Sequence, residues 1–229
     1  MYKVYILHGW TYSTEKWEPF LKILRENGVE YKVLKIPGLT APLSNIWTLD
    51  DYTSWLNRIT KNEERITLLG HSNGGRIAAA FTAKYPGRVS HLILIDSAGI
   101  IDRGLRAILK KYLFEFVAKT GKKIIRSSSV RNLLYRAIGE QDYNRADPIL
   151  KRTMINLISE NLDPSFAKIT VPTLIIWGGN DKITPISDGK KINELIHGSK
   201  LEVIDTAKHS PQFTHPQKTT EIILKFLAI

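Results

Sequence analysis

The sequence predicts an α/β protein with a doubly wound, mostly parallel sheet of about six strands and an inserted helical cap. Six short runs rich in β-branched residues recur along the 229 residues, and amphipathic helical patterns lie between them. The runs are almost continuously apolar, as is typical of parallel strands that helices cover on both faces. The cap is predicted because this alternation of strands and helices is interrupted once.

The expected strands cover residues 2–7, 31–36, 65–69, 91–95, 173–177 and 201–204. A first helix is expected where an apolar stripe with helical spacing runs from Trp17 to Leu24 and Gly28 follows it. A second runs from Ile77 to Tyr85 and ends at Pro86. A third is expected around residues 219–227.

The interruption lies between residues 102 and 165, where three helical patterns follow one another without a strand. The third opens at Asp147 and Pro148, an N-cap aspartate followed by proline at the first helical position. We therefore expect residues 1–101 and 166–229 to form an α/β core and residues 102–165 to form a helical cap.

The charge is strongly basic and is concentrated in the predicted cap. The chain carries a formal charge of +11, and residues 102–165 hold 13 basic and 7 acidic side chains. Six basic residues there could steer an anionic substrate or an acidic carrier protein, although an ordinary solvated surface explains them more simply. These residues are Arg106, Lys110, Lys111, Lys122, Lys123 and Arg126.

Composition excludes several classes of protein. No nucleic-acid-binding module is recognisable, and no apolar run approaches the ~20 residues of a membrane span, so we expect neither a nucleic-acid partner nor a membrane span. The chain has no cysteine, which excludes disulfides, thiol catalysis and cysteine-bound metals. A strand pattern that begins at Tyr2 leaves no room for a secretory signal. We predict a soluble, cytoplasmic protein that is a monomer or a homodimer.

A GxSxG motif provides the candidate nucleophile. The expected strand at 65–69 runs directly into Gly70, His71, Ser72, Asn73 and Gly74, after which a helix begins. The backbone of a nucleophile at such a turn is strained and lies close to the helix, and glycine tolerates both conditions. The pentapeptide also occurs in ordinary turns with a capping serine. Its place between strand and helix favours Ser72 as an exposed nucleophile.

Three aspartates follow expected strands and could orient a catalytic histidine. Asp181 follows the strand at 173–177, Asp96 the strand at 91–95 and Asp205 the strand at 201–204. Aspartates in such places also commonly hydrogen-bond their own backbone in turns. We prefer Asp181 for its order in the chain and its loop position, with Asp96 as the backup.

One of the six histidines has the position of a general base. His209 lies on the loop after the last expected strand, whereas His71 neighbours the nucleophile but points elsewhere in such a turn. Ser72, Asp181 and His209 follow one another in the order of a nucleophile, an orienting acid and a general base, each after the carboxyl end of a strand. We predict that these three residues form a catalytic triad.

Two backbone N–H groups are candidates for an oxyanion hole. The first strand ends at His8, Gly9 and Trp10, so a loop lies where a second donor is needed beside Asn73, the residue after the nucleophile. We predict the N–H groups of Trp10 and Asn73 as donors. His8 is expected to be structural, and the indole of Trp10 either lines the acyl pocket or packs in the core.

Four segments together resemble the α/β-hydrolase superfamily over nearly the whole chain, especially small serine esterases and carbon–carbon bond hydrolases. They are HGW at 8–10, GHSNGG at 70–75, WGGNDKITP at 177–185 and KHSPQFTHP at 208–216. The resemblance implies the same triad and oxyanion donors, a cap at 102–165, and no metal or organic cofactor. The chain departs from the family at Tyr12 and Lys208, where glycine is common, and begins at what would be the third strand.

The expected function is carboxylic-ester hydrolysis through an acyl-Ser72 intermediate, with a small-molecule acyl ester as substrate. Serine at the nucleophile position argues against the superfamily branches that use aspartate. Two alternatives within the fold are a carbon–carbon bond hydrolase and a hydrolase of anionic or carrier-linked esters. An alternative of another class is a small-molecule-binding protein with little turnover.

Overall fold

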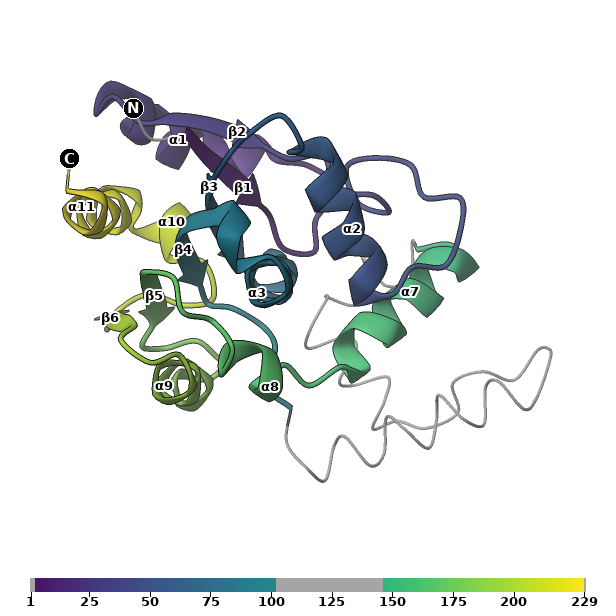
Figure 1. Cartoon of the computed structure of the whole chain (residues 1–229). Coiled ribbons are helices and arrows are strands. Elements are labelled where there is room, and N and C mark those ends of the chain that lie inside the picture. The colour runs from purple at the N-terminus through teal and green to yellow at the C-terminus, as the bar shows by residue number, and fades with distance from the viewer. Residues whose placement is uncertain (1–2, 102–145, 229) are drawn as a thin grey trace.

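The sheet predicted from the sequence is confirmed. The structure, a computed structural model, describes residues 3–101 and 146–228 (Figure 1). Within these ranges six parallel strands form one sheet in the order β2-β1-β3-β4-β5-β6. The strands are β1 (Lys3–Leu7), β2 (Glu30–Val33), β3 (Ile66–His71), β4 (Val89–Ile95), β5 (Thr173–Gly178) and β6 (Lys200–Ile204).

The strand bounds differ from the expected ones by one to three residues, and pairing explains the differences at the carboxyl ends of β3 and β2. β3 continues two residues further than expected, because Gly70 pairs with Leu7 and Leu94 and His71 pairs with Ile95. β2 is shorter at its carboxyl end. The N–H of Leu34 still reaches the carbonyl of Ile6 at 2.9 Å, and the chain then turns out of the sheet.

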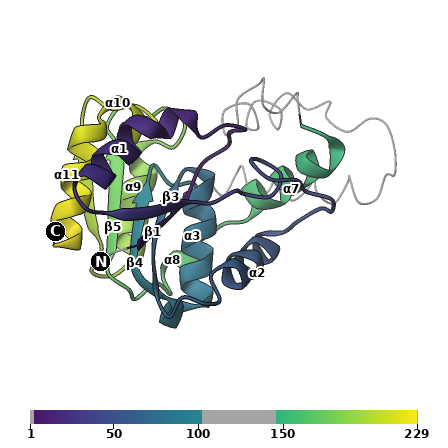
Figure 2. The same cartoon turned by 90° about the horizontal axis from the view of Figure 1, so that it is seen from above.

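Helices cover both faces of the sheet (Figures 1 and 2). On one face lie α1 (Glu18–Glu26) and α11 (Pro216–Leu227); on the other lie α2 (Leu49–Ile59), α3 (Asn73–Lys84), α8 (Asp163–Phe166) and α9 (Ile186–Leu195). Alternate residues of β1 serve the two layers, since Val4 and Ile6 pack towards α1 whereas Tyr5 and Leu7 pack towards α3. This explains the continuous apolar runs, because a strand covered on both faces needs apolar side chains at every position.

Shorter elements join these layers. They are the 3-10 turns η1 (Glu15–Trp17) and η2 (Pro86–Arg88) and the helix α10 (Pro211–Thr214). Among the residues that the structure describes, no helix is long and apolar enough to cross a lipid bilayer.

The helix α2 was not predicted from the sequence, although its beginning carries a clear signal. The Thr48 hydroxyl accepts the N–H of Asp51 at 3.3 Å, and the Asp51 carboxylate accepts the N–H of Thr48 at 2.7 Å. This reciprocal capping box is a standard helix start. The helix then buries Leu49, Tyr52 and Leu56 at helical spacing.

Of the predicted cap, the structure describes only the last part. The helix α7 (Pro148–Ser159) begins as expected, with the Asp147 carboxylate accepting the N–H of Leu150 at 2.8 Å. The first two helical patterns, and the six basic residues proposed to steer substrates, lie outside the described residues. At its far end α7 is tied to the core, because the buried Arg76 donates to the carbonyl of Glu160 at 2.8 Å.

Gly74 lets the helix α3 lie directly on β1. A Cβ atom at Gly74 would fall on the carbonyl group of Leu7 and 2.6 Å from the carbonyl oxygen of His8. Main-chain atoms on both sides leave no flexible side chain that could move away. Only glycine therefore permits this approach of helix and strand.

We expect Gly74→Ala to lower the free energy of unfolding by about 3 kcal/mol, because overpacking against the main chain cannot relax. Without the contact, alanine would stabilise a helix by about 1 kcal/mol relative to glycine, so the sign tests the contact. The matched control is Gly87→Ala, since a Cβ there meets no atom within 4 Å. Urea unfolding measures both variants, and equal stability of the two would contradict the proposed crowding.

Candidate active site

Ser72 stands at the sharp turn between β3 and α3. Its backbone adopts φ 52° and ψ −118°, an unfavourable conformation for a residue with a side chain. Two hydrogen bonds hold it there: the N–H of Ser72 donates to the carbonyl of Ile95 at 3.0 Å, and the N–H of Ala98 donates to the carbonyl of Ser72 at 3.0 Å. The end of β4 thus supports the strained turn.

The structure brings His209 to Ser72. Nε2 of His209 lies 3.0 Å from Oγ of Ser72, and Nδ1 lies 2.7 Å from Oδ2 of Asp181. A carboxylate can only accept, so Nδ1 carries a hydrogen and Nε2 has its lone pair directed to the serine hydroxyl. This is the arrangement in which a histidine can take the proton of a serine.

The side chain of Asp181 is completely buried, and it accepts four hydrogen bonds. Oδ1 accepts the N–H groups of Ile183 at 2.7 Å and Thr184 at 3.1 Å. Oδ2 accepts the hydroxyl of Thr184 at 2.7 Å and Nδ1 of His209 at 2.7 Å. These donors replace the water that a buried carboxylate loses.

Main-chain contacts join the loops that carry the acid and the histidine. The N–H of Gly179 donates to the carbonyl of Ile204 at 3.0 Å, and the N–H of Asn180 donates to the carbonyl of Ala207 at 2.9 Å. Gly178 permits this approach, because a Cβ there would meet the carbonyl groups of Ala207 and Lys208. The separation of Asp181 and His209 is therefore set by backbone rather than by flexible side chains.

The two predicted oxyanion donors come from separate segments, the loop after β1 and the beginning of α3. Asn73 is the first residue of α3, where N–H groups have no partner within the helix. Trp10 follows Gly9, at which a Cβ would lie 3.1 Å from Cβ of Ser72. Neither N–H, of Trp10 or of Asn73, donates to any residue in the two described ranges.

His71 supports the loop of His209 and is not itself placed to react. Its Nε2 lies 3.3 Å from the carbonyl oxygen of His209, to which it donates. Burial and the neighbouring His209 hold the pKa of His71 well below its ordinary value, so the ring stays neutral. The ring also packs edge-on against Trp17, with 6.0 Å between the ring centroids.

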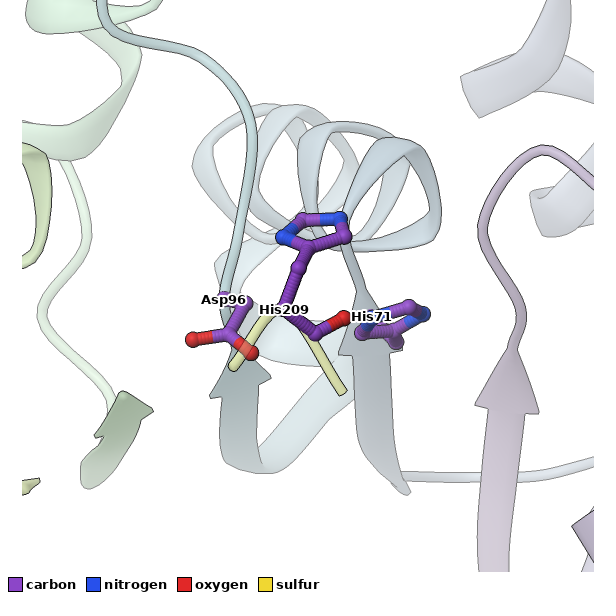
Figure 3. A group of neighbouring side chains, drawn as sticks. All are labelled: His71, Asp96 and His209. Atoms are coloured by element: carbon purple, nitrogen blue, oxygen red, sulfur yellow. Dashed lines mark hydrogen bonds between the residues drawn. The ribbon is translucent and has the colours of Figure 1, made fainter. Parts of the chain in front are cut away.

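Asp96, the backup acid of the sequence analysis, lies beside His209 but makes no hydrogen bond to it in the described part of the chain. Figure 3 shows Asp96 and His71 on either side of His209 at the ends of their strands. Oδ1 of Asp96 accepts the N–H of Gly178 at 2.8 Å, whereas Oδ2 is buried and has no partner among the described residues. Burial raises the pKa of Asp96 to about 8. Asp205, the third candidate acid, is exposed.

The same three side chains are the one group in the described ranges with the make-up of a metal site. One nitrogen or oxygen atom from each of His71, Asp96 and His209 lies within 4.8 Å of the others. However, His71 already donates to a carbonyl, and the ring of His209 lies between Ser72 and Asp181. A cation here would break the Ser72–His209 contact, so we assign no metal to this group.

The parallel sheet, with a strained serine and a histidine–aspartate pair at the carboxyl ends of its strands, defines an α/β hydrolase. The family described as "Serine aminopeptidase, S33" matches residues 46–214. The chain therefore belongs to this hydrolase family, and its expected membership of the α/β-hydrolase superfamily is confirmed.

The individual relatives are distant in sequence, and their names describe different hydrolases. Human "Monoacylglycerol lipase ABHD6" is 25% identical over 98% of this chain and 75% of its own length. The "2-hydroxy-6-oxononadienedioate/2-hydroxy-6-oxononatrienedioate hydrolase" of Klebsiella pneumoniae is 25% identical over 98% of this chain and 86% of its own length. An esterase from Exiguobacterium antarcticum shares the fold, with a TM-score of 0.73 and 23% identity over 100% of this chain and 92% of the other.

The neutral, buried Asp96 predicts a loss of stability with rising pH. Its pKa in the folded protein, about 8, lies above the value of about 3.9 in an unfolded chain. The unfolded state therefore releases its proton first, and stability falls between these values by at most about 1.4 kcal/mol per pH unit.

We expect the difference in unfolding free energy between the natural protein and Asp96→Asn to fall as pH rises from 5 to about 8. Asparagine keeps an acceptor for the N–H of Gly178 but does not titrate. All other titrating groups are common to both proteins and cancel in the difference. Urea unfolding across this range measures it, and a constant difference would show that Asp96 is ionised throughout.

Proposed function

We propose that this hydrolase cleaves carboxylic esters through an acyl-Ser72 intermediate. The observation that carries the proposal is the continuous hydrogen-bonded chain from Ser72 Oγ through His209 to Asp181, with distances of 3.0 Å and 2.7 Å. We propose esters as the substrate class because the names of two similar proteins, a lipase and an esterase, describe enzymes that cleave esters.

In the proposed reaction Oγ of Ser72 attacks the ester carbonyl carbon while Nε2 of His209 takes the hydroxyl proton. His209 then gives this proton to the leaving alcohol, and the acyl group stays on the serine. A water molecule, activated by the same nitrogen, releases the acid. Asp181 holds the ring in the productive tautomer and stabilises its positive charge throughout.

The N–H groups of Trp10 and Asn73 are the proposed donors to the oxyanion. Both are unbonded within the described residues; Asn73 directly follows Ser72, and Trp10 follows Gly9, which lies against Ser72. The N–H of Asn73 also lies at the positive end of the helix α3. Donors fixed before substrate arrives need no rearrangement when the negative charge develops.

We further propose that residues 102–165 form a cap over the site. Support comes from α7, which belongs to this segment and contacts the loop before α2: Thr153 Oγ1 accepts the N–H of Trp47 at 3.0 Å. A cavity of about 240 Å³ lies between the loop after β2 and the beginning of α7, with both polar and apolar surface in its lining. Its lining residues are Tyr12, Gly38, Ala41, Pro42, Leu43, Ala146, Asp147 and Leu150.

Replacement of the nucleophile tests the proposal directly. We expect Ser72→Ala to lower kcat/KM for acyl esters by about 10⁴-fold or more, and to abolish covalent labelling by a fluorophosphonate probe. Ser54→Ala, which changes an exposed serine of α2, is the matched control and keeps both activities.

Peptide mass spectrometry locates the label, and a panel of esters, aminoacyl amides and vinylogous diketones identifies the bond that is cleaved. Activity on diketones alone would favour the carbon–carbon bond hydrolase reading. Folded protein that is neither labelled nor active would favour the small-molecule-binding protein.

Substitutions at three aspartates test whether Asp181, rather than Asp96 or Asp205, is the acid that orients His209. We expect Asp181→Asn to lower kcat by about 10⁴-fold, because an amide favours the wrong tautomer of His209. Asp205→Asn changes an exposed carboxylate after the last strand and leaves kcat unchanged. Steady-state kinetics measures both. A larger loss in Asp96→Asn than in Asp181→Asn would reverse the assignment of the acid.

A further inference from the structure

His8 lies at the end of β1 with no exposed surface, and both nitrogens of its ring have partners. Nδ1 lies 2.8 Å from the carbonyl oxygen of Gly9, and Nε2 lies 2.9 Å from the hydroxyl oxygen of Thr40. The histidine therefore connects the loop before Trp10 with the loop after β2. None of the catalytic steps described above uses it.

The partners determine where the hydrogens lie. A carbonyl oxygen only accepts, so Nδ1 of His8 carries a hydrogen and donates to Gly9. Burial lowers the pKa of His8, which leaves the ring neutral and Nε2 as an acceptor. The hydroxyl oxygen of Thr40 already accepts the N–H of Ile36 at 2.9 Å, so its own hydrogen is available for Nε2. The N–H of Ile36, the hydroxyl of Thr40, the ring of His8 and the carbonyl of Gly9 thus form one chain, in which each group donates a hydrogen bond to the next.

This chain ends on the peptide group that bears a proposed oxyanion donor. The carbonyl of Gly9 and the N–H of Trp10 belong to one planar trans peptide and point in opposite directions. A bond that fixes the carbonyl against the His8 ring therefore fixes the direction of the N–H. Gly9 lies against the nucleophile, because a Cβ there would be 3.1 Å from Cβ of Ser72 and 3.1 Å from Nδ1 of His71.

We propose that His8 is a positioning residue for the oxyanion hole. Its Nδ1–H orients the Gly9–Trp10 peptide so that the Trp10 N–H faces the reacting carbonyl, and the hydrogen bond from Thr40 holds the His8 ring in place. The inference rests on the proposed function and adds a role for residues outside the triad. A His8 that merely filled space would depend on its volume and not on which nitrogen donates.

Two substitutions at His8 separate these roles. In His8→Asn the side-chain amide is placed to mimic Nδ1 and keeps a donor for Gly9, whereas in His8→Gln the amide is placed to mimic Nε2 and loses that donor. We expect His8→Gln to lower kcat for an acyl ester by about 100-fold, as for loss of an oxyanion donor, with KM changed less than about threefold. We expect His8→Asn to retain kcat within about tenfold of the natural protein.

Thr40 provides a second pair that leaves the histidine in place. We expect Thr40→Val to lower kcat by about tenfold and Thr40→Ser, which keeps the hydroxyl, to stay within about threefold. Inhibition by a boronic acid should weaken in parallel with kcat, because the tetrahedral adduct uses the same donors. Melting temperatures are recorded for all four variants, so that activity is compared only between folded proteins.

The outcomes separate the two hypotheses. A natural protein without esterase activity or Ser72 labelling would contradict the proposed function, and with it the role of His8. An active natural protein with equal kcat losses in His8→Asn and His8→Gln, or in Thr40→Val and Thr40→Ser, would overturn the positioning role alone. Should His8→Gln fail to fold, the Thr40 pair decides.

Discussion

The arrangement of the site depends on the hydrogen bonds that the buried carboxylate of Asp181 accepts. A carboxylate without water is costly unless each oxygen is satisfied, and here two main-chain N–H groups, one hydroxyl and one imidazole do so. Three of these four donors come from Ile183 and Thr184. The loop after β5 must therefore fold tightly round its own aspartate, and this leaves one lone-pair direction for His209.

The other side of the site is supported by strain rather than by charge. Ser72 adopts its unfavourable backbone conformation because hydrogen bonds from the end of β4 hold it on both sides. Gly70, Gly74 and Gly75 remove the side chains that would collide with neighbouring atoms. The histidine connects the two sides, and its loop is held by main-chain bonds to the acid loop and by His71.

Much of this could be predicted from the sequence, because the physical requirements are local. Strands buried on both faces need continuous apolar runs, and a serine at a tight strand-to-helix turn needs glycine neighbours, so the sequence predicts β3, the turn and α3 together. The capping box at Thr48 and Asp51 would have revealed α2 by the same kind of reasoning. Local sequence does not decide whether Asp181 or Asp96 bonds to His209. Both aspartates follow strands, and only the packing of the loops brings Asp181 to the histidine. The contact of His8 with Thr40 likewise joins residues 32 positions apart, and nothing in either local sequence indicates it.

The contact of Gly74 with Leu7 bears on how such a protein can diversify. The strand that leads to Trp10 and the helix that begins at Asn73 are spaced by main chain against main chain. Changes of side chain around the substrate can therefore reshape the pocket without altering that spacing. Substitution is least tolerated at the glycines that permit these close approaches, and side chains elsewhere around the site can change without moving the main chain.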